Sequence, residues 1–153
     1  NKVVSGENSI TQASFKTKLN KKYFASFSEV QKAQKGRGTQ CLIDARPAAF
    51  FTGEKKHAKA RIPGRLANAR NLQEGNLIDA SFKIKPSSEI KSQFGGLDGI
   101  AKYKGYISYC NTGHWAATVW FGLSEIAQIP NVKMYDGGMT HWTSNPKREV
   151  DLG

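Results

Sequence analysis

Cysteine is scarce in this chain of 153 residues, which carries only Cys41 and Cys110. Two cysteines are too few for a small fold held together by disulfides. Long apolar runs are also missing. The longest, residues 115–123, is well short of the ~18 residues that span a bilayer, so we expect no membrane partner. Because 39% of the residues are hydrophobic and are spread along the chain, the sequence predicts a globular protein with one core.

The N-terminus shows no signal peptide, and the chain begins at Asn1 rather than at a methionine. This start fits removal of an export signal, so we favour a periplasmic or otherwise exported location over the cytoplasm. A trimmed sequence would begin in the same way. We expect residues 1–27 to form an N-terminal extension that packs on a domain made of residues 28–153.

Acidic residues are few in the first part of the chain. Residues 1–70 hold 15 Lys/Arg and 4 Asp/Glu, whereas residues 71–153 hold 8 of each, so the first part supplies the whole net charge of +11. Its basic clusters form either a solvated surface or one that attracts a small anion or an acidic protein. No aromatic residues are interleaved to stack bases, so we expect no nucleic-acid partner. The clusters are Lys16/Lys18/Lys21/Lys22 and Lys55/Lys56/Lys59/Arg61.

Short apolar runs alternate with helical patterns. Strands are predicted at residues 41–44, 106–109 and 131–136. Helical segments are predicted at residues 28–35 with Ser28 as the N-cap, and at residues 48–51, 88–94 and 115–127. This order is typical of an α/β domain with a mainly parallel sheet.

Cys110 falls at the turn between a predicted strand and a predicted helix. Free backbone N–H groups and the helix dipole favour negative charge there, and therefore the thiolate. We predict that Cys110 is a nucleophile, with a buried structural cysteine as the alternative. The turn also supplies the candidate substrate-binding residues, which are Asn111, Thr112, Gly113, His114 and Trp115.

The remaining cysteine and the histidines are weaker candidates for catalytic or metal-binding residues. Cys41 lies within an apolar run and is predicted to belong to the core. His114 is either a proton donor or part of the loop scaffold, while His57 and His141 are interpreted as surface or structural residues. These side chains lack the spacing of zinc ligands, so we expect no metal site.

Four segments resemble the rhodanese family of sulfurtransferases in order and spacing. The resemblance runs from about Ser28 to the C-terminus and is greatest to the catalytic, C-terminal domain of tandem rhodaneses. It implies a small α/β domain whose central parallel sheet has helices on both faces, and it implies an upstream rhodanese domain as a partner absent from this chain. The segments are LIDAR (42–46), RIPGR (61–65), YCNTGHW (109–115) and VKMYDGGMTHW (132–142).

The resemblance also implies a reaction. Cys110 would attack the outer sulfur of a small anionic donor such as thiosulfate, with mercaptopyruvate as the second choice. Sulfite would leave, and the backbone N–H groups of residues 111–115 would cradle a persulfide. A thiol or cyanide would then accept the sulfur, without a cofactor or metal. Two pairs of family residues would be structural: Asp44 with Arg46, and Asp136 with Trp142.

The chain departs from the family pattern around the predicted pocket. Relatives often place a substrate-binding arginine where this chain has Phe50, and a histidine where it has Arg61. Thiosulfate enzymes often carry Arg or Lys in the loop after the cysteine, whereas this loop offers only His114. Such a pocket would favour a less charged donor, unless residues 55–65 supply the missing cations.

Three other functions are weighed against a free-standing enzyme. A phosphatase or arsenate reductase would need Cys-x5-Arg to grip an oxyanion, but the arginine position is Ala116. A binding module without catalysis is a second alternative, although such modules often lack the cysteine. A sulfur or selenium carrier that docks an acidic protein partner is the third.

Overall fold

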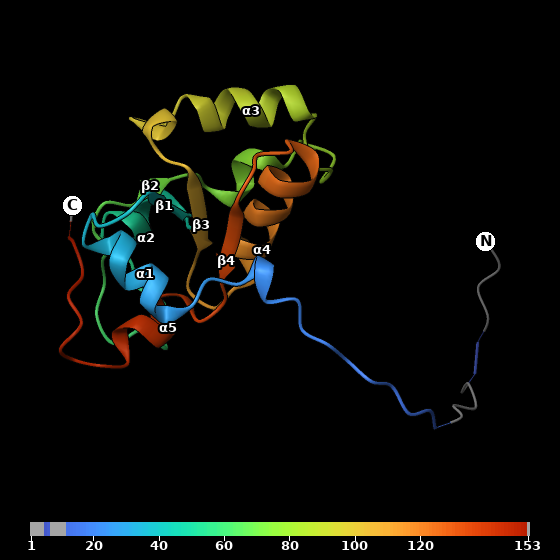
Figure 1. The fold of residues 1–153 in the computed structure, drawn as a ribbon, viewed down its shortest axis with the longest axis horizontal. Coiled ribbons are helices and arrows are strands. Elements are labelled where there is room, and N and C mark those ends of the chain that lie inside the picture. Colours follow the sequence, from blue (N-terminus) through green and yellow to red (C-terminus); the bar gives the residue numbers. More distant parts are fainter. Residues whose placement is uncertain (1–4, 7–11, 153) are drawn as a thin grey trace.

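The computed structural model describes residues 5–6 and 12–152, and a parallel sheet lies at its centre (Figure 1). The strand order β2-β1-β3-β4 places the two most apolar strands in the middle. The predicted α/β class is confirmed, although the two-residue strand β2 was not predicted. The strands are β1 (Gln40–Asp44), β2 (Arg70–Asn71), β3 (Gly105–Tyr109) and β4 (Val132–Tyr135).

Helices cover both faces of this sheet, because successive side chains of β1 point to opposite sides. Cys41 and Ile43 join the core beneath α3 and α4. Leu42 joins a second core beneath α1 and α5. The α-helices are α1 (Phe27–Gln34), α2 (Ala48–Phe51), α3 (Ser87–Gly95), α4 (His114–Phe121) and α5 (Gly138–Thr143). Short helical turns are η1 (Lys21–Tyr23), η2 (Glu74–Leu77), η3 (Ile100–Lys102) and η4 (Gly122–Ile126).

Helix α1 begins earlier than predicted. Ser26, rather than Ser28, is the N-cap: its side chain accepts from the Glu29 N–H, and the Glu29 carboxylate accepts from the Ser26 N–H at 2.8 Å. This reciprocal capping box satisfies two backbone donors at once. Ser26-x-x-Glu29 therefore decides the start of the helix.

The single helix predicted over residues 115–127 is two segments. Helix α4 ends at Phe121 and continues as the π-helical η4. A Cβ atom at Gly122 would lie 2.5 Å from Leu77 Cδ2, so glycine permits close packing against η2 at this junction. None of the helices in the described part of the chain is long and apolar enough to cross a membrane.

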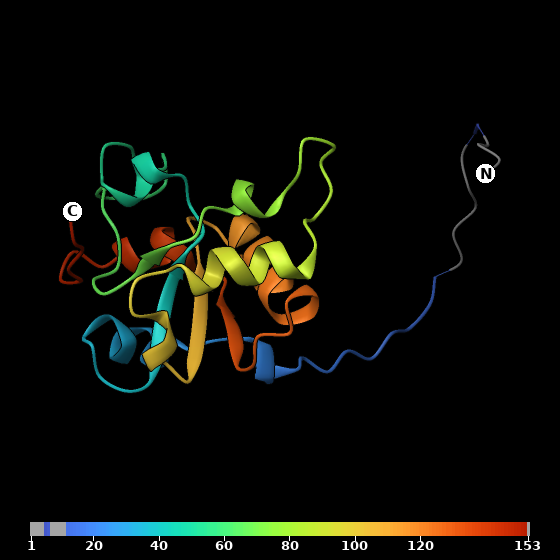
Figure 2. The same ribbon diagram turned by 90° about the horizontal axis from the view of Figure 1, so that it is seen from above.

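The N-terminal segment divides into two stretches. Residues 12–20 are exposed and lead away from the body of the domain (Figures 1 and 2). From Tyr23 onward the chain contacts the domain: the Tyr23 ring packs edge-on against Trp120, and the Ala25 N–H donates to the Met134 carbonyl at 2.8 Å. Residues 1–4 and 7–11 of the expected extension lie outside the described residues. The expected boundary after residue 27 stays a prediction.

Candidate active site

Cys110 lies where the sequence predicts it, directly after β3 and before α4. Its side chain is 1% exposed, and the Gly113 N–H donates to the Cys110 Sγ at 3.1 Å. Gly113 has a φ of 96°, which lets the chain curl back toward the sulfur. The first N–H groups of α4 have no acceptor within the helix. The sulfur thus lies beside a helix end that favours negative charge.

The sulfur lies in a pocket of ≈ 290 Å³, which we call the Cys110 pocket. Four of the five predicted substrate-binding residues line it. Its sixth residue is His57, which sequence reasoning interpreted as a surface or structural side chain. The lining residues are His57, Cys110, Asn111, Thr112, His114 and Trp115.

His57 comes from the charged loop between α2 and β2, whose fold brings it to the pocket. The His57 Nδ1 accepts from the Lys59 N–H at 3.2 Å, so a neutral ring carries its proton on Nε2. The sequence indicates that this loop is charged, but no spacing identifies which of its residues lines the Cys110 pocket.

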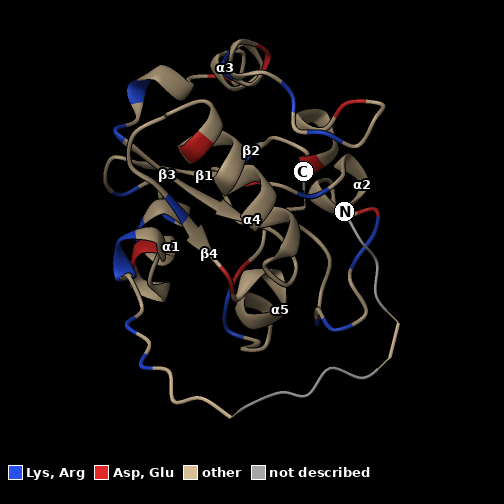
Figure 3. Ribbon diagram, turned by 90° about the vertical axis from the view of Figure 1, so that its right-hand side faces the viewer, with Lys and Arg blue, Asp and Glu red and all other residues tan. Residues whose placement is uncertain are grey.

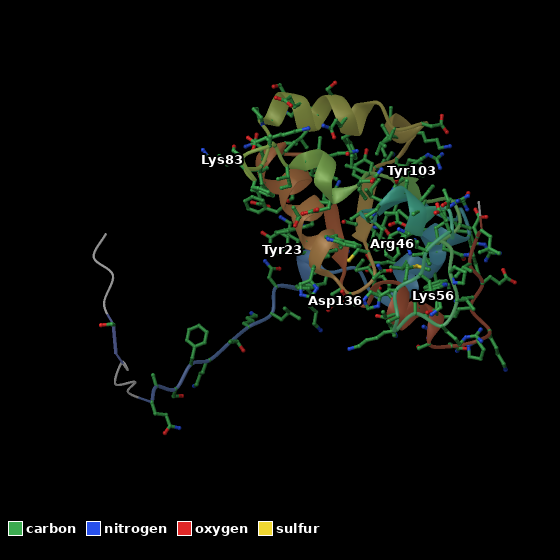
Figure 4. The ribbon with its side chains drawn as sticks, turned by 180° about the vertical axis from the view of Figure 1, so that it is seen from behind. Tyr23, Arg46, Lys56, Lys83, Tyr103 and Asp136 are labelled. Atoms are coloured by element: carbon green, nitrogen blue, oxygen red, sulfur yellow. The ribbon has the colours of Figure 1, made fainter. Side chains whose placement is uncertain are left out.

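A buried ion pair braces the loop that carries Cys110. Arg46 and Asp44 are 2% and 0% exposed, and their side chains meet at 2.6 Å. Arg46 also donates to Asn111 Oδ1 at 3.4 Å and to the Gly64 carbonyl at 2.9 Å. Although burial opposes its charge, the hydrogen bonds and charge of Asp44 raise the pKa of Arg46. Figure 4 shows Arg46 within the body of the domain. The structural role predicted for this pair is confirmed.

The start of α5 closes the other side of the loop. The Met139 N–H donates to the Cys110 carbonyl at 2.8 Å, and the Thr140 Oγ1 donates to the Asn111 carbonyl at 3.0 Å. Gly138 has a φ of +55°, and a Cβ atom there would lie 2.5 Å from each of these two carbonyl oxygens. Glycine is therefore required at this contact, which the sequence presents only as part of a Gly-Gly turn.

Polar side chains of the Cys110 loop differ in whether they have a hydrogen-bond partner. Asn111 is 2% exposed, and its Nδ2 has no hydrogen-bond acceptor in the described part of the chain. The Thr112 hydroxyl pairs with His114 Nδ1 at 3.3 Å. Asn111, a lining residue of the Cys110 pocket, thus retains a buried N–H donor without an acceptor in the described part of the chain.

Aromatic side chains flank the pocket. The rings of Trp115 and Phe50 pack edge-to-face with their centroids 6.0 Å apart. The nearby cations turn to backbone oxygens: Lys56 Nζ donates to the Ala60 carbonyl at 3.0 Å and Arg61 Nη2 to the Pro146 carbonyl at 3.4 Å. None of the Lys or Arg side chains within residues 55–65 lines the Cys110 pocket.

The other candidate residues are not among the residues that line the Cys110 pocket. Cys41 is 1% exposed, and burial raises the pKa of its thiol to about 11. Trp142 is buried and donates to the Glu149 carbonyl at 2.9 Å. Asp136 is exposed on the turn before α5 (Figure 4). Within residues 5–6 and 12–152, no group of three or more His, Cys, Asp or Glu is placed to hold a metal ion.

Comparison with known sequences gives one family and several relatives. The Rhodanese-like domain family matches residues 26–145. A 3-mercaptopyruvate sulfurtransferase from Escherichia coli (strain K12) is 32% identical over 114 residues, which cover 74% of this chain and 40% of that protein. A Mycobacterium leprae protein assigned as a thiosulfate sulfurtransferase is 27% identical over 122 residues, covering 76% and 40%. The chain thus spans about two fifths of these relatives' length.

Solved structures share the same fold. The Tum1 protein from Saccharomyces cerevisiae superposes with a TM-score of 0.69 at 25% identity, over 86% of this chain and 47% of that chain. An anaerobic ergothioneine biosynthesis enzyme from Chlorobium limicola superposes with a TM-score of 0.75 at 20% identity, over 86% and 32%, which indicates a common fold alone. Because the family match covers most of the chain, the protein belongs to the rhodanese-like domain family.

Proposed function

We propose that this domain is a sulfurtransferase that carries a sulfane sulfur on Cys110. The observation that supports this most is the Gly113 N–H, which donates to the Cys110 Sγ at 3.1 Å in a pocket at the start of α4. An N–H aimed at a sulfur stabilises the thiolate that attacks and the charge that returns to the sulfur. The names of the relatives agree with this chemistry.

The reaction consists of two successive nucleophilic displacements at sulfur. The Cys110 thiolate attacks the outer sulfur of thiosulfate, the S–S bond of the donor breaks, and sulfite leaves with the bonding electron pair. A thiolate or cyanide then attacks the outer sulfur of the persulfide, and the Cys110 thiolate leaves with its electrons. This is covalent catalysis with two separate substrates.

The charge around the pocket bears on the identity of the donor. Thiosulfate is a dianion, and the nearby Lys56 and Arg61 point at backbone carbonyls rather than into the pocket. The Asn111 amide and the two pocket histidines, His57 and His114, would bind either a sulfonate or a carboxylate oxygen. A pocket with few cations is better suited to a donor with one negative charge than to a dianion. 3-Mercaptopyruvate carries a single carboxylate, so it is a second candidate donor beside thiosulfate.

Single-turnover loading tests the proposal. The reduced protein is mixed with excess thiosulfate or 3-mercaptopyruvate, the released sulfite or pyruvate is quantified, and the desalted protein is weighed. We expect one product molecule per chain and a gain of one sulfur atom in mass. C110A should show neither, because it lacks the nucleophile.

Cys41 provides the matched control, because its thiol is buried in the core. C41A should load as the original protein does. If neither donor yields a product or a gain in mass, the domain is a binding module and the proposal is wrong. Hydrolysis of an aryl phosphate that depends on Cys110 would favour the phosphatase alternative instead.

A further inference from the structure

A second hollow lies at the end of the sheet where the parallel strands begin, opposite the end that carries Cys110. It measures ≈ 720 Å³ and runs between the first residues of β1, β3 and β4, with η4 along one side; we call it the amino-edge groove. Cys110 follows the last residue of β3, so the two sites are separated by the length of the strands, roughly 15 Å. The groove is lined by Lys22, Tyr23, Glu29, Lys32, Arg37, Gly38, Thr39, Gln40, Lys104, Gly105, Ser124, Glu125, Gln128, Ile129, Pro130, Asn131, Val132 and Lys133.

The groove carries more positive than negative charge. Lys133 is neutralised, because its Nζ lies 2.6 Å from Glu29 Oε1, a pairing that helps to lower the pKa of Glu29 to about 2. The other acid, Glu125, accepts from the Ser124 hydroxyl. Among the described residues, four further cations of the groove form no ion pair: Lys22, Lys32, Arg37 and Lys104.

The basic surface continues beyond the groove along the N-terminal segment. Lys16, Lys18 and Lys21 are exposed on the stretch that leads to Lys22 and η1. Figure 3 shows Lys and Arg positions in blue along the chain that enters the domain and on α1. One of the two basic clusters of the sequence thus extends the groove, whereas the other lies on the loop that contributes His57 to the Cys110 pocket.

The lining identifies the class of ligand. Ile129, Pro130 and Val132 give the groove an apolar portion among its cations. Tyr23 is the one aromatic side chain among the described residues of the groove, and its ring packs edge-on against Trp120, with the ring centroids 5.4 Å apart, so it is already engaged. A nucleic acid would find no unengaged aromatic face on which to stack a base. An extended polypeptide with acidic and apolar residues matches both the charge and the apolar contacts.

We propose that the amino-edge groove docks an acidic polypeptide segment of a partner protein and leaves the Cys110 pocket open. The charge complementarity of four unpaired cations carries the proposal, which does not rest on sulfur transfer. A partner held at this edge would be tethered to the domain without covering the thiol.

Fluorescence anisotropy with a labelled peptide of Glu and Leu residues tests the proposal. We expect saturable binding that weakens with rising salt, because exposed charges are screened. The triple variant K32E/R37E/K104E should weaken binding at least about tenfold. The matched control K83E/K85E/K91E makes the same charge change outside the groove and should leave the affinity within about twofold. Circular dichroism checks that both variants fold.

Two further controls test whether acidic side chains are needed for binding and whether binding is independent of the Cys110 pocket. A peptide with Gln in place of Glu should not bind, and alkylation of Cys110 should leave the affinity for the acidic peptide unchanged. Absence of peptide binding, or equal losses in the two triple variants, would overturn the proposal. Tighter binding of a single-stranded oligonucleotide of equal charge, lost in the groove variant, would instead make this a nucleic-acid surface.

Discussion

The two edges of the sheet differ in how their charges are used. At the carboxyl edge the buried Arg46 is fully engaged by Asp44, Asn111 and Gly64, and nearby exposed cations turn to carbonyl oxygens. At the amino edge Lys32, Arg37 and Lys104 are exposed and unpaired among the described residues. The first arrangement fixes the geometry of a small loop, and the second leaves charge available to a large ligand.

The net charge of the chain does not by itself locate the reactive site. The excess of +11 suggests an anionic partner, but it does not say whether the partner reaches the reactive thiol. Among the described residues, two histidines and no Lys or Arg line the Cys110 pocket, whereas five Lys or Arg residues line the amino-edge groove. We therefore propose that the net charge serves docking and that the geometry of the Cys110 loop serves the chemistry.

Removing one partner from an ion pair at each edge should give the largest contrast. R46M leaves the Asp44 carboxylate buried and unpaired, so we expect a loss of about 3–5 kcal/mol in the free energy of unfolding. K133M removes a half-exposed pair and should cost less than about 1 kcal/mol. Urea denaturation of the two variants measures both. Similar losses would contradict the contrast between the edges.

Adding the single variant D44N and the double variant D44N/R46M tests whether the buried pair acts as a unit. D44N/R46M should be less destabilised than the sum of the two single variants, because neither partner then leaves a buried charge alone. Additive losses would indicate that the pair does not act as a unit. Sulfur loading should fall in R46M, since the Asn111 side chain loses the guanidinium that holds it.

Alanine substitution of two glycines with positive φ should give the next largest losses in the free energy of unfolding. G138A places a Cβ atom 2.5 Å from the Cys110 and Asn111 carbonyls, so we expect a loss of about 2–4 kcal/mol and slower sulfur loading. Gly38, at the amino-edge groove, has a φ of +101° but no atom within 4 Å of such a Cβ. G38A should therefore cost about 1–2 kcal/mol, from backbone strain alone, and should load normally.

Thermal or chemical denaturation and single-turnover loading distinguish these glycine variants. If G138A loads at the original rate, the contact between α5 and the Cys110 loop does not set the geometry of the thiol. If G38A also loses loading, the two edges are coupled rather than independent.

Local chemistry made part of this fold predictable. The runs Cys41–Asp44 and Tyr106–Tyr109 are short, apolar and bounded by turn residues, and both are strands of the parallel sheet. Strand β2 has only two residues and therefore no periodicity to detect. Helix α5 begins within a Gly-Gly pair that resembles a turn, because Gly138 meets a steric requirement set by a distant loop.

Part of the candidate site was also predictable from the sequence. The position of Cys110 follows from the order strand, turn, helix, and the family motif supports the same loop. His57 was missed because the fold of the 18-residue loop between α2 and β2 determines which of its side chains lines the Cys110 pocket. Such a placement depends on tertiary contacts, and spacing along the sequence does not encode it.

Acid titration should give the smallest effect. The pKa of Glu29 is lowered from 4.5 to about 2: hydrogen bonds from Lys133 and Ser26, with the charge of Lys133, outweigh the opposing effect of burial. A depressed pKa stabilises the fold above the unfolded value and loses that contribution as the pH falls through the folded value. The stability difference between the original protein and E29Q should be constant above about pH 5.5 and shrink between 4.5 and about 2.

This difference should remain below about 1 kcal/mol, because both side chains are part-exposed. Glutamine retains the capping box with Ser26, so E29Q isolates the charge. A difference that does not change with pH would show that the Glu29 charge contributes nothing to stability.

The residue that carries the transferred sulfur can be identified by peptide mass. After loading with thiosulfate or 3-mercaptopyruvate, trapping with an alkylating reagent and digestion with trypsin, peptide masses separate the two cysteines, since residues 105–133 contain Cys110 and no internal Lys or Arg. We predict one additional sulfur on this peptide and none on the peptide that contains Cys41. Additional sulfur on Cys41, or on neither peptide with either donor, would contradict the assignment of Cys110 as the sulfur carrier.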